Sequence, residues 1–449
     1  MNRAPLGSRY RRLLGSAVAA NLGDGLVLVA VMWLASSLTR DPLLITLLGL
    51  ASRLPWLVLS LPAGVLVDRV DRRLLVGTMD LVRCAAVAAL GVLVWTQQDA
   101  LPTPAELAGG APTPASAPLL LAGLGVVTLV LGCAEVVRDN AAQTLMPSLV
   151  ERDQLERANS RLWGAETTMN SFVGPPLGGV LVAVALAVPF LTHAGLLAVS
   201  AVLVLGIGGA ARRGARAAPD AQDRRPRPAR AGWRAELAEG FGWLWRHRLL
   251  RTLALLLGVM NMLSSAAFVV VVLFVQEILG ILDGWAFGLV TTGAAAGAVA
   301  GSLVGDRIVA RLSAGRALAA AVLVMGLGLL VVATTSSPVV FWLAEVVTGL
   351  AVVVWNVVTV SMRQRLIPDA LLGRVNSVYR FFGWGMMSAG ALLGGGLVAL
   401  GEPLLGREAA LRAPVLLAAL GYLVLLPVAW RHLHPERVAA AESAAAGAR

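Results

Sequence analysis

The chain has 449 residues, of which 57% are hydrophobic and 14% charged, and its mean hydropathy is +0.77. A soluble domain carries roughly 25% charged residues, so this composition excludes a water-soluble protein. Apolar runs of about 20 residues, the length needed to cross the hydrocarbon layer, recur along the whole chain. The sequence therefore predicts a polytopic membrane protein rather than a signal peptide followed by an ectodomain.

Charges and Pro/Gly clusters divide the apolar runs into twelve predicted helices. They cover residues 13–38, 43–67, 74–96, 118–146, 160–183 and 189–210 in the first half, and 249–277, 284–305, 316–333, 339–362, 377–400 and 412–430 in the second. The predicted fold class is an all-α polytopic membrane protein. Two pseudo-symmetric six-helix bundles at 1–210 and 249–430 flank a cytoplasmic linker at 211–248, and a cytoplasmic tail follows at 431–449.

The distribution of arginine predicts the orientation. All 37 basic residues are arginines, and the lack of lysine excludes a P-loop ATPase, whose phosphate site needs one. If both termini are cytoplasmic, 28 arginines lie in inward segments and three in outward loops, as the positive-inside rule requires. The net charge of +11 then follows from topology, and we expect no nucleic-acid partner.

The linker has two parts. Residues 224–228 are rich in Pro and Arg, which predicts a flexible segment. Toward its end, apolar residues recur at helical spacing from Trp233 to Trp245. This pattern predicts either an amphipathic helix on the inner leaflet or an N-terminal extension of the seventh span.

The two halves repeat a set of landmarks at similar offsets. The pairs include Asn21 with Asn261, Asp68-Arg69 with Asp306-Arg307, Gln143 with Gln364, Arg157 with Arg374, and Gly174 with Gly390. The offset changes most where the loop at 97–117 corresponds to a much shorter loop at 334–338. Parallel repeats are typical of transporters whose substrate cavity lies between the halves near the midplane. A duplicated structural bundle is the alternative.

Two motifs carry a family resemblance. Gly64-Val-Leu-Val-Asp68-Arg69-Val-Asp71-Arg72-Arg73 follows the second span, and Gly174-Pro175-Pro176-Leu177-Gly178-Gly179 lies in the fifth. The first resembles the major facilitator superfamily signature between helices two and three. The second is similar to the motif that proton-coupled exporters of this family carry in helix five.

Further stretches sharpen the resemblance. Asn21-Leu-Gly-Asp24 and Asp80-x-x-Arg83 are similar to the branch that contains bacterial drug, macrolide and siderophore (enterobactin-type) exporters. The resemblance covers residues 13–430. It implies a twelve-helix transporter that is not an enzyme, and we expect no cofactor.

Packing rules give the first motif a role as an inner gate. Gly64 lets its helix approach a neighbour closely, and Asp68 can face the positive N-terminus of another helix, which by resemblance belongs to span eleven. The three arginines of the motif then bridge to inner acids such as Asp139 or Glu151 when the inward face is shut. Alternatively, they anchor the loop at the anionic leaflet.

The second motif predicts a bend. Pro175-Pro176 removes two backbone donors, and the neighbouring glycines allow tight packing there. A similar small-residue face occurs in span eight, and we interpret it as a packing surface. Its members are Gly293, Gly297, Gly301 and Gly305.

Polar residues inside the bilayer are few, because a charge at mid-depth costs from about 3 to over 10 kcal/mol. Counting ~1.5 Å per residue places Asp24, Arg53, Asn170 and Asn261 near mid-depth, and Glu135 within a turn or two of it. Asp24 is the first candidate for proton coupling, because apolar surroundings favour its protonated form.

Several other polar residues have two interpretations each. Glu135 either couples protons or forms a structural pair with Arg138, three residues on. Arg53 pairs with Asp24 or with an anionic substrate. Glu345, in the outer half of span ten, is a proton exit or only reaches the interface.

The remaining polar residues divide between structure and cavity. Asp80 and Arg83 form an i, i+3 pair that we interpret as structural. His193 is alone, so we expect no metal site. Asn21, Trp355 and Asn356 would line a central cavity with Arg53, Asn170 and Asn261 if spans one, four, seven and ten face inward, as the resemblance implies.

These observations predict a secondary active transporter that exports small amphipathic organic molecules, such as drug-like natural products or siderophores, by proton antiport with alternating access. Its partners would be the substrate, protons and the lipid bilayer. We expect a monomer in the bacterial inner membrane. The alternatives are an importer or facilitator of a small solute, or a non-transporting membrane scaffold or sensor that tolerates neutralisation of Asp24 and Glu135.

Overall fold

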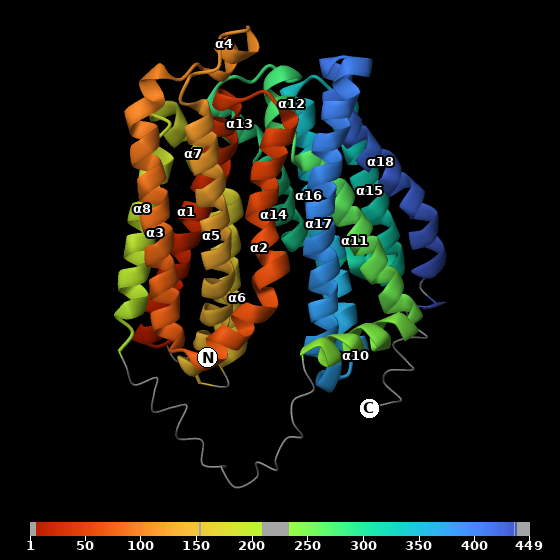
Figure 1. Cartoon of the computed structure of the whole chain (residues 1–449). Helices are drawn as coiled ribbons and strands as arrows, with labels where there is room; N and C mark the ends of the chain where they lie inside the picture. The colour runs from red at the N-terminus through yellow and green to blue at the C-terminus, as the bar shows by residue number, and fades with distance from the viewer. Residues whose placement is uncertain (1–5, 152–153, 209–232, 435, 438–449) are drawn as a thin grey trace. The chain divides into compact units, whose positions relative to one another are not determined.

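The computed structural model describes residues 6–151, 154–208, 233–434 and 436–437, apart from some side chains inside the helices. All regular secondary structure in this part of the chain is helical (Figure 1), which confirms the predicted all-α class.

The elements of the first half follow the predicted spans. They are α1 (Ser8–Leu38), α2 (Pro42–Arg69), α3 (Arg72–Gln97), η1 (Gln98–Ala100), α4 (Pro104–Ala108), α5 (Ala117–Leu145), η2 (Met146–Ser148), α6 (Leu155–Thr167), η4 (Thr168–Val173), α7 (Gly174–Val184) and α8 (Val188–Leu205).

The second half begins with a short helix outside the spans. Its elements are α10 (Trp233–Arg246), α11 (Arg248–Phe268), α12 (Val271–Glu277), α13 (Gly284–Val290), α14 (Gly293–Leu312), α15 (Ala314–Thr334), α16 (Pro338–Leu366), α17 (Asp369–Leu405) and α18 (Arg407–His432).

Within the described residues, eleven helices are long and apolar enough to cross a membrane. The predicted fifth span is absent from this set because it is divided into α6, the π-helical η4 and α7. Pro175 and Pro176 carry no N–H, so carbonyls of η4 lack their usual α-helical donors. The predicted span 249–277 is also interrupted, after Phe268, and the predicted span 284–305 after Val290.

The helices form two compact units. One contains Met1–Arg40, Leu47–Arg225 and Leu282–Leu289, and the other Asp41–Thr46, Pro226–Ile281 and Val290–Arg449. We refer to them as the N-terminal and C-terminal units. A core of α1, α3, α5 and α8 side chains fills part of the first, with Leu13, Val76, Ala141 and Val204 fully buried.

The structure describes only the last part of the predicted linker, from residue 233 onward. Residues 224–228 lie outside the described part of the chain. Helix α10 is separate from α11, because the backbone at His247 is extended and its side chain caps α11 by accepting from the Leu250 amide. On α10, Leu244 is buried whereas Phe241 and Trp245 are exposed. The location of α10 on the inner leaflet stays a prediction.

Glycines allow close helix crossings, as expected for membrane helices. A Cβ atom on Gly293 would lie 2.6 Å from the Trp342 carbonyl oxygen, and one on Gly301 would lie 2.9 Å from that of Leu350. Both contacts join α14 to α16, so the predicted packing surface of span eight is confirmed at these positions.

Candidate functional site: a buried charge cluster

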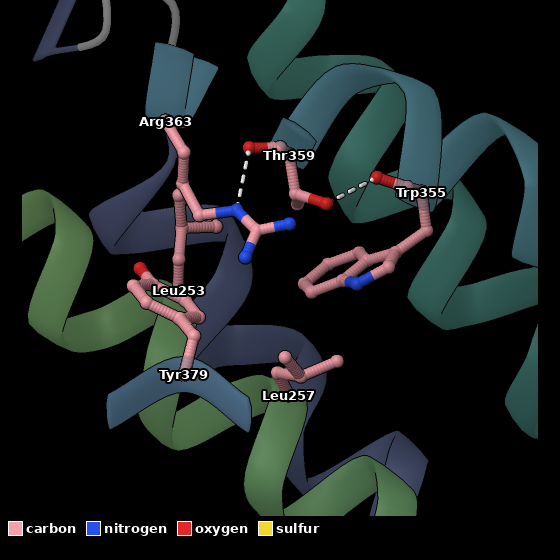
Figure 2. A pocket seen from close by; sticks show the side chains of 6 residues that line it. All are labelled: Leu253, Leu257, Trp355, Thr359, Arg363 and Tyr379. Carbon is pink, nitrogen blue, oxygen red and sulfur yellow. Dashed lines mark hydrogen bonds between the residues drawn. The ribbon is translucent and has the colours of Figure 1, made fainter. Parts of the chain in front are cut away.

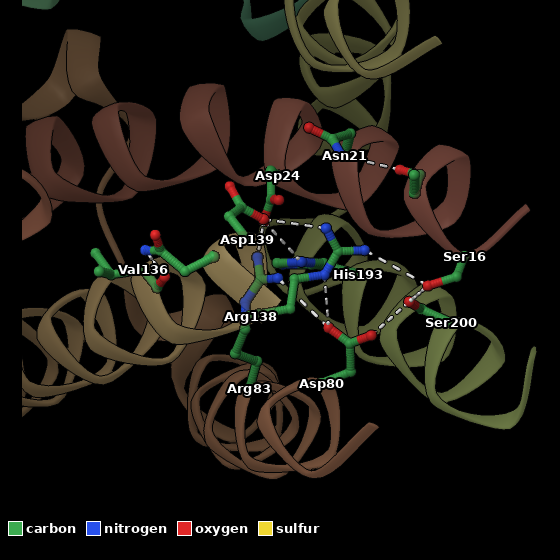
Figure 3. Close-up of polar contacts among 12 residues, drawn as sticks. Ser16, Asn21, Asp24, Asp80, Arg83, Val136, Arg138, Asp139, His193 and Ser200 are labelled. Atoms are coloured by element: carbon green, nitrogen blue, oxygen red, sulfur yellow. Dashed lines mark hydrogen bonds and ion pairs between the residues drawn. The ribbon is translucent and has the colours of Figure 1, made fainter. Parts of the chain in front are cut away.

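A cluster of charged residues lies in the N-terminal unit, on α1, α3, α5 and α8 (Figure 3). Its members are Asp24, Asp80, Arg83, Arg138, Asp139 and His193. Four of their side chains are at most 2% exposed, whereas Asp24 and Asp139 are 19% and 31% exposed. These two carboxylates are therefore the parts of the cluster that the surrounding residues leave partly uncovered.

Asp24 has two partners on one oxygen. Arg83 donates to its Oδ1, and Nε2 of His193 lies 3.3 Å from the same atom. Arg53 does not form this ion pair; it lies within electrostatic reach of Glu135. The expectation that Arg53 is the internal partner of Asp24 is thus replaced by Arg83, one residue of the pair that we had interpreted as structural.

Asp80 connects four helices. Its Oδ2 accepts a 2.6 Å hydrogen bond from Ser200, and its Oδ1 lies 3.3 Å from Arg138 Nε and 3.7 Å from Arg83 Nη1. Ser200 in turn is 2.7 Å from the hydroxyl of Ser16 on α1. The carboxylate therefore contributes to the compensation of both buried guanidinium groups, beside Asp24 for Arg83 and Asp139 for Arg138.

Arg138 points away from the partner expected for it. Its Nη1 donates to Asp139 Oδ1 at 3.1 Å and its Nη2 approaches the Ser16 hydroxyl at 3.5 Å. The ion pairs of Arg138 are with Asp80 and Asp139, so the pairing of Glu135 with Arg138 is wrong. Glu135 lies within electrostatic reach of Asp24, Asp139, Arg83 and Arg53 instead.

The directly connected groups do not balance in charge. Three carboxylates face two guanidinium groups, so the cluster has one excess negative charge while His193 is neutral. One bound proton would neutralise it. An uncompensated charge in low-dielectric surroundings is costly, so the arrangement has a capacity for a single proton.

Two glycines position Asp24. A Cβ atom on Gly23 would overlap the imidazole of His193, so the absence of a side chain there seats the ring beside the carboxylate. A Cβ atom on Gly25 would lie 2.6 Å from the Asn170 carbonyl oxygen and 2.8 Å from Gly174 Cα. Asp24 is therefore held between α8 on one side and the η4–α7 junction, where the exporter motif begins, on the other.

The inner-gate arginines contact helix ends rather than acids. Arg72 donates to the Thr144 carbonyl of α5 at 3.1 Å, and Arg73 to the Ile207 carbonyl beyond α8 at 2.6 Å. Cations in these places stabilise helix C-termini. Asp71 caps α3 by accepting from the Arg73 amide. Bridging of Arg72 or Arg73 to Asp139 or Glu151 is therefore not what the structure contains.

Other parts of the gate prediction stay predictions. Arg69 is exposed, and the surroundings of Gly64 and the side chain of Asp68 lie outside the described part of the chain. The same holds for Asn376 and Ser377, at the expected partner end of span eleven.

The asparagines predicted for the cavity have local or interhelical roles. Asn21 donates to Ala17 of its own helix at 3.0 Å, and Asn261 donates to the Gly383 carbonyl of α17 at 3.4 Å. Asn170 is half-buried in η4, and Asn356 is exposed on α16. Cavity roles for these residues stay predictions.

A small pocket occurs in the C-terminal unit (Figure 2). It is lined by Leu253, Leu257, Trp355, Thr359, Arg363 and Tyr379. The Arg363 guanidinium carbon lies 4.7 Å from the centre of the Tyr379 ring, and the buried indole N–H of Trp355 has no hydrogen-bond acceptor among the residues that the structure describes. The cavity measures about 10 Å³, far below the roughly 300–1,000 Å³ of small-molecule pockets and no larger than the space that one water molecule needs.

Glu345 lies on α16, ten residues before Trp355. It is half-buried on α16, and a Cβ atom on Gly293 would lie 2.8 Å from its own Cβ. Its carboxyl makes no hydrogen bond or ion pair within the described residues.

Among the described residues, no group of three or more His, Cys, Asp or Glu side chains could hold a metal ion.

His193 was not predicted to belong to the site. Asp80 and Arg83 were predicted only as a structural pair. A signal was available, because a histidine inside a membrane span is a polar group that needs a partner. The flanking of Asp24 by two glycines was another, since it indicates close neighbours on both sides. Which neighbours these are depends on tertiary packing.

Curated relatives of this chain are multidrug efflux pumps. The chain is 26% identical over 397 residues to the "Multidrug efflux pump Tap" of Mycobacterium tuberculosis, covering 86% of both proteins. It is 30% identical over 173 residues to the pump of the same name from Mycolicibacterium fortuitum, an alignment that spans 38% of each.

Solved structures share the fold at low sequence identity. A bacterial homologue of the iron transporter ferroportin in the inward-facing state has a TM-score of 0.70 and 16% identity, covering 96% of this chain and all of that one. The nucleoside transporter NupG has a TM-score of 0.65 and 12% identity, covering 95% and 100%. At these identities the likeness concerns the fold alone.

A family model matches most of the chain, residues 13–391. It agrees with the helical architecture, with the eleven helices long enough to span a membrane and with the motifs read from the sequence. The chain is a multi-pass membrane transporter and belongs to the Major Facilitator Superfamily.

Proposed function

We propose that this transporter exports small amphipathic organic molecules, of the drug-like or siderophore type, in exchange for protons. It would act in the bacterial inner membrane with both termini in the cytoplasm and with its two halves alternating access to a central cavity. The curated relatives support efflux, because their names describe multidrug efflux pumps.

The observation that carries the proton coupling is the placement of Asp24. Its carboxylate is partly exposed, yet it holds a fully buried arginine and lies against the exporter motif through Gly25. Protonation would remove the negative charge that Arg83 compensates. Because Arg83 also faces Asp80, a change at Asp24 would redistribute contacts among α1, α3 and α5.

The other site residues are proposed in supporting roles. Glu135 lies within electrostatic reach of Asp24 and is the second proton-binding candidate. Glu345 is the candidate proton exit in the C-terminal unit. Trp355 is a candidate substrate contact, because its indole N–H would donate to an acceptor on the substrate.

The test is uptake of ethidium, an amphipathic fluorescent probe, and of a panel of similar dyes into inverted vesicles with an imposed acid-inside pH gradient. We expect gradient-dependent accumulation with the wild type and its loss in Asp24→Asn. The matched control is Asp99→Asn, because Asp99 is an exposed carboxylate in η1, directly after α3, and it should transport like the wild type.

The same assay separates the alternatives. Equal accumulation with and without the gradient would contradict proton coupling. An importer would concentrate the probe only in vesicles of the opposite orientation. A scaffold or sensor would accumulate none of the dyes and would not respond to Asp24→Asn.

A further inference from the structure

The least explained member of the charge cluster is His193. Its side chain is fully buried in α8, and neither of its ring nitrogens makes a hydrogen bond to a described residue, although Nε2 lies within ion-pair distance of Asp24. A histidine that served only to fill space could be replaced by an apolar residue with no desolvation penalty. A polar ring that is buried beside a carboxylate therefore indicates a specific role for His193.

The imidazole presents one nitrogen to one acid. Nε2 lies 3.3 Å from Asp24 Oδ1, and the ring rests against Gly23, where any side chain would displace it. Figure 3 shows His193 pointing toward Asp24 and Arg83 from the side of α8. Asp24 therefore has an imidazole nitrogen on one side and a permanent cation on the other.

The charges around this pair favour a single shared proton. His193 is faced by Asp24 from α1 and by Asp80 and Arg83 from α3, and Asp24 is faced in addition by Arg138 and Glu135 from α5. An imidazolium here would stand beside Arg83, but the excess carboxylate of the cluster compensates it. The cluster is then neutral with one proton bound.

We propose that His193 is the proton-transfer partner of Asp24, so that the transported proton is bound by the two residues as a pair. A proton that arrives at the exposed carboxyl forms an O–H bond on Asp24. Passing it inward breaks that O–H bond and forms an N–H bond at Nε2, which leaves a carboxylate and an imidazolium. Release reverses both steps. This inference rests on the proposed proton coupling and adds the second residue to it.

One experiment tests the pair without any substrate. The chain has four histidines, so ¹⁵N-histidine labelling of the full-length protein in nanodiscs gives a spectrum in which His193→Gln identifies the His193 signals. In the wild type these signals should titrate. In Asp24→Asn the midpoint should move by about one pH unit or more, as expected when a charge within ~4–6 Å is removed. An unchanged midpoint would overturn the proposal.

A second experiment measures transport. In the ethidium assay, the uptake rate of His193→Gln should be about tenfold or more below that of the wild type, because a positioned proton-transfer group contributes roughly 10²–10⁴-fold in rate. Its remaining activity should also lose the wild-type pH profile. Glutamine keeps a polar side chain of similar size, so a merely structural histidine would keep the profile, and that result would overturn the proposal. The control is His434→Gln, on an exposed C-terminal side chain.

The two proposals fail in different ways. If the wild type shows no gradient-driven transport, the proposed function is wrong, and the ¹⁵N titration still decides whether Asp24 and His193 share a proton. If the wild type transports but His193→Gln keeps both rate and pH profile, only the role of His193 is wrong.

Discussion

Gly25 and Gly174 pack backbone against backbone, one residue away from Asp24. A Cβ atom on Gly25 would lie 2.8 Å from the Gly174 Cα, a distance that real side chains do not tolerate. The exporter motif and the proposed proton site are thus joined at a single helix crossing. A movement of α7 about the π-helical η4 would therefore displace the Asp24 carboxylate.

Gly25→Ala should destabilise the protein, by about 1–3 kcal/mol as for other overpacked sites, because the new methyl group would meet backbone atoms that cannot move aside. Thermal unfolding in detergent measures the effect. The matched control is Gly195→Ala on α8, where a Cβ atom meets nothing within 4 Å. A Gly25→Ala variant as stable as this control would show that the crossing is looser than described.

Asp80→Asn should lower the stability of the folded protein more than Asp139→Asn does. It would leave the guanidinium groups of Arg83 and Arg138 without the carboxylate they share, and removing one partner of a buried ion pair costs about 3–5 kcal/mol. Asp139→Asn should cost less, because Asp139 is 31% exposed and water can replace it. Equal losses of stability in the two variants would contradict the central place given to Asp80.

Glu345→Gln should leave the stability of the protein unchanged, unlike Asp80→Asn. The Glu345 carboxyl has no ion pair or hydrogen bond in the described structure, so its neutralisation should not lower the unfolding temperature. If Glu345 is the proton exit, gradient-driven ethidium uptake should nevertheless slow. A variant that transports at the wild-type rate would leave Glu345 as an interfacial residue.

The cap of α11 should make stability depend on pH. Burial lowers the pKa of His247, whose neutral ring accepts from the Leu250 amide. Because the unfolded chain then binds a proton more readily than the folded one, stability should fall as pH drops below the ordinary value near 6.5. In His247→Asn, which caps without titrating in this range, this part of the acid sensitivity should disappear from unfolding curves between pH 5 and 8. Curves identical to the wild type would exclude the cap as its source.

Local patterns predicted the fold well and the site only in part. The length and hydropathy of each span follow from the need to satisfy every backbone group within the bilayer, so the helices could be read from the residues. Asp24 could be found in the same way, because an acid in an apolar run is conspicuous. Its partners could not, since Arg83 and His193 lie on other helices and reach it only through packing that Gly23 permits.

The corrections have a common physical cause. Glu135 and Arg138 are three residues apart, yet Arg138 pairs instead with the fully buried Asp80 on another helix and with the adjacent Asp139. Arg72 and Arg73 likewise find the unpaired carbonyls at helix ends. Spacing along one helix identifies possible pairs, but the tertiary arrangement decides among them.

The most direct test of proton exchange through Asp24 is the proton flux itself. Proteoliposomes containing a pH indicator, with no imposed pH gradient, would be given a gradient of ethidium. We predict that ethidium movement drives protons in the opposite direction in the wild type and that Asp24→Asn abolishes this proton flux. Ethidium movement by the wild type without any proton flux, or an equal flux in Asp24→Asn, would contradict it.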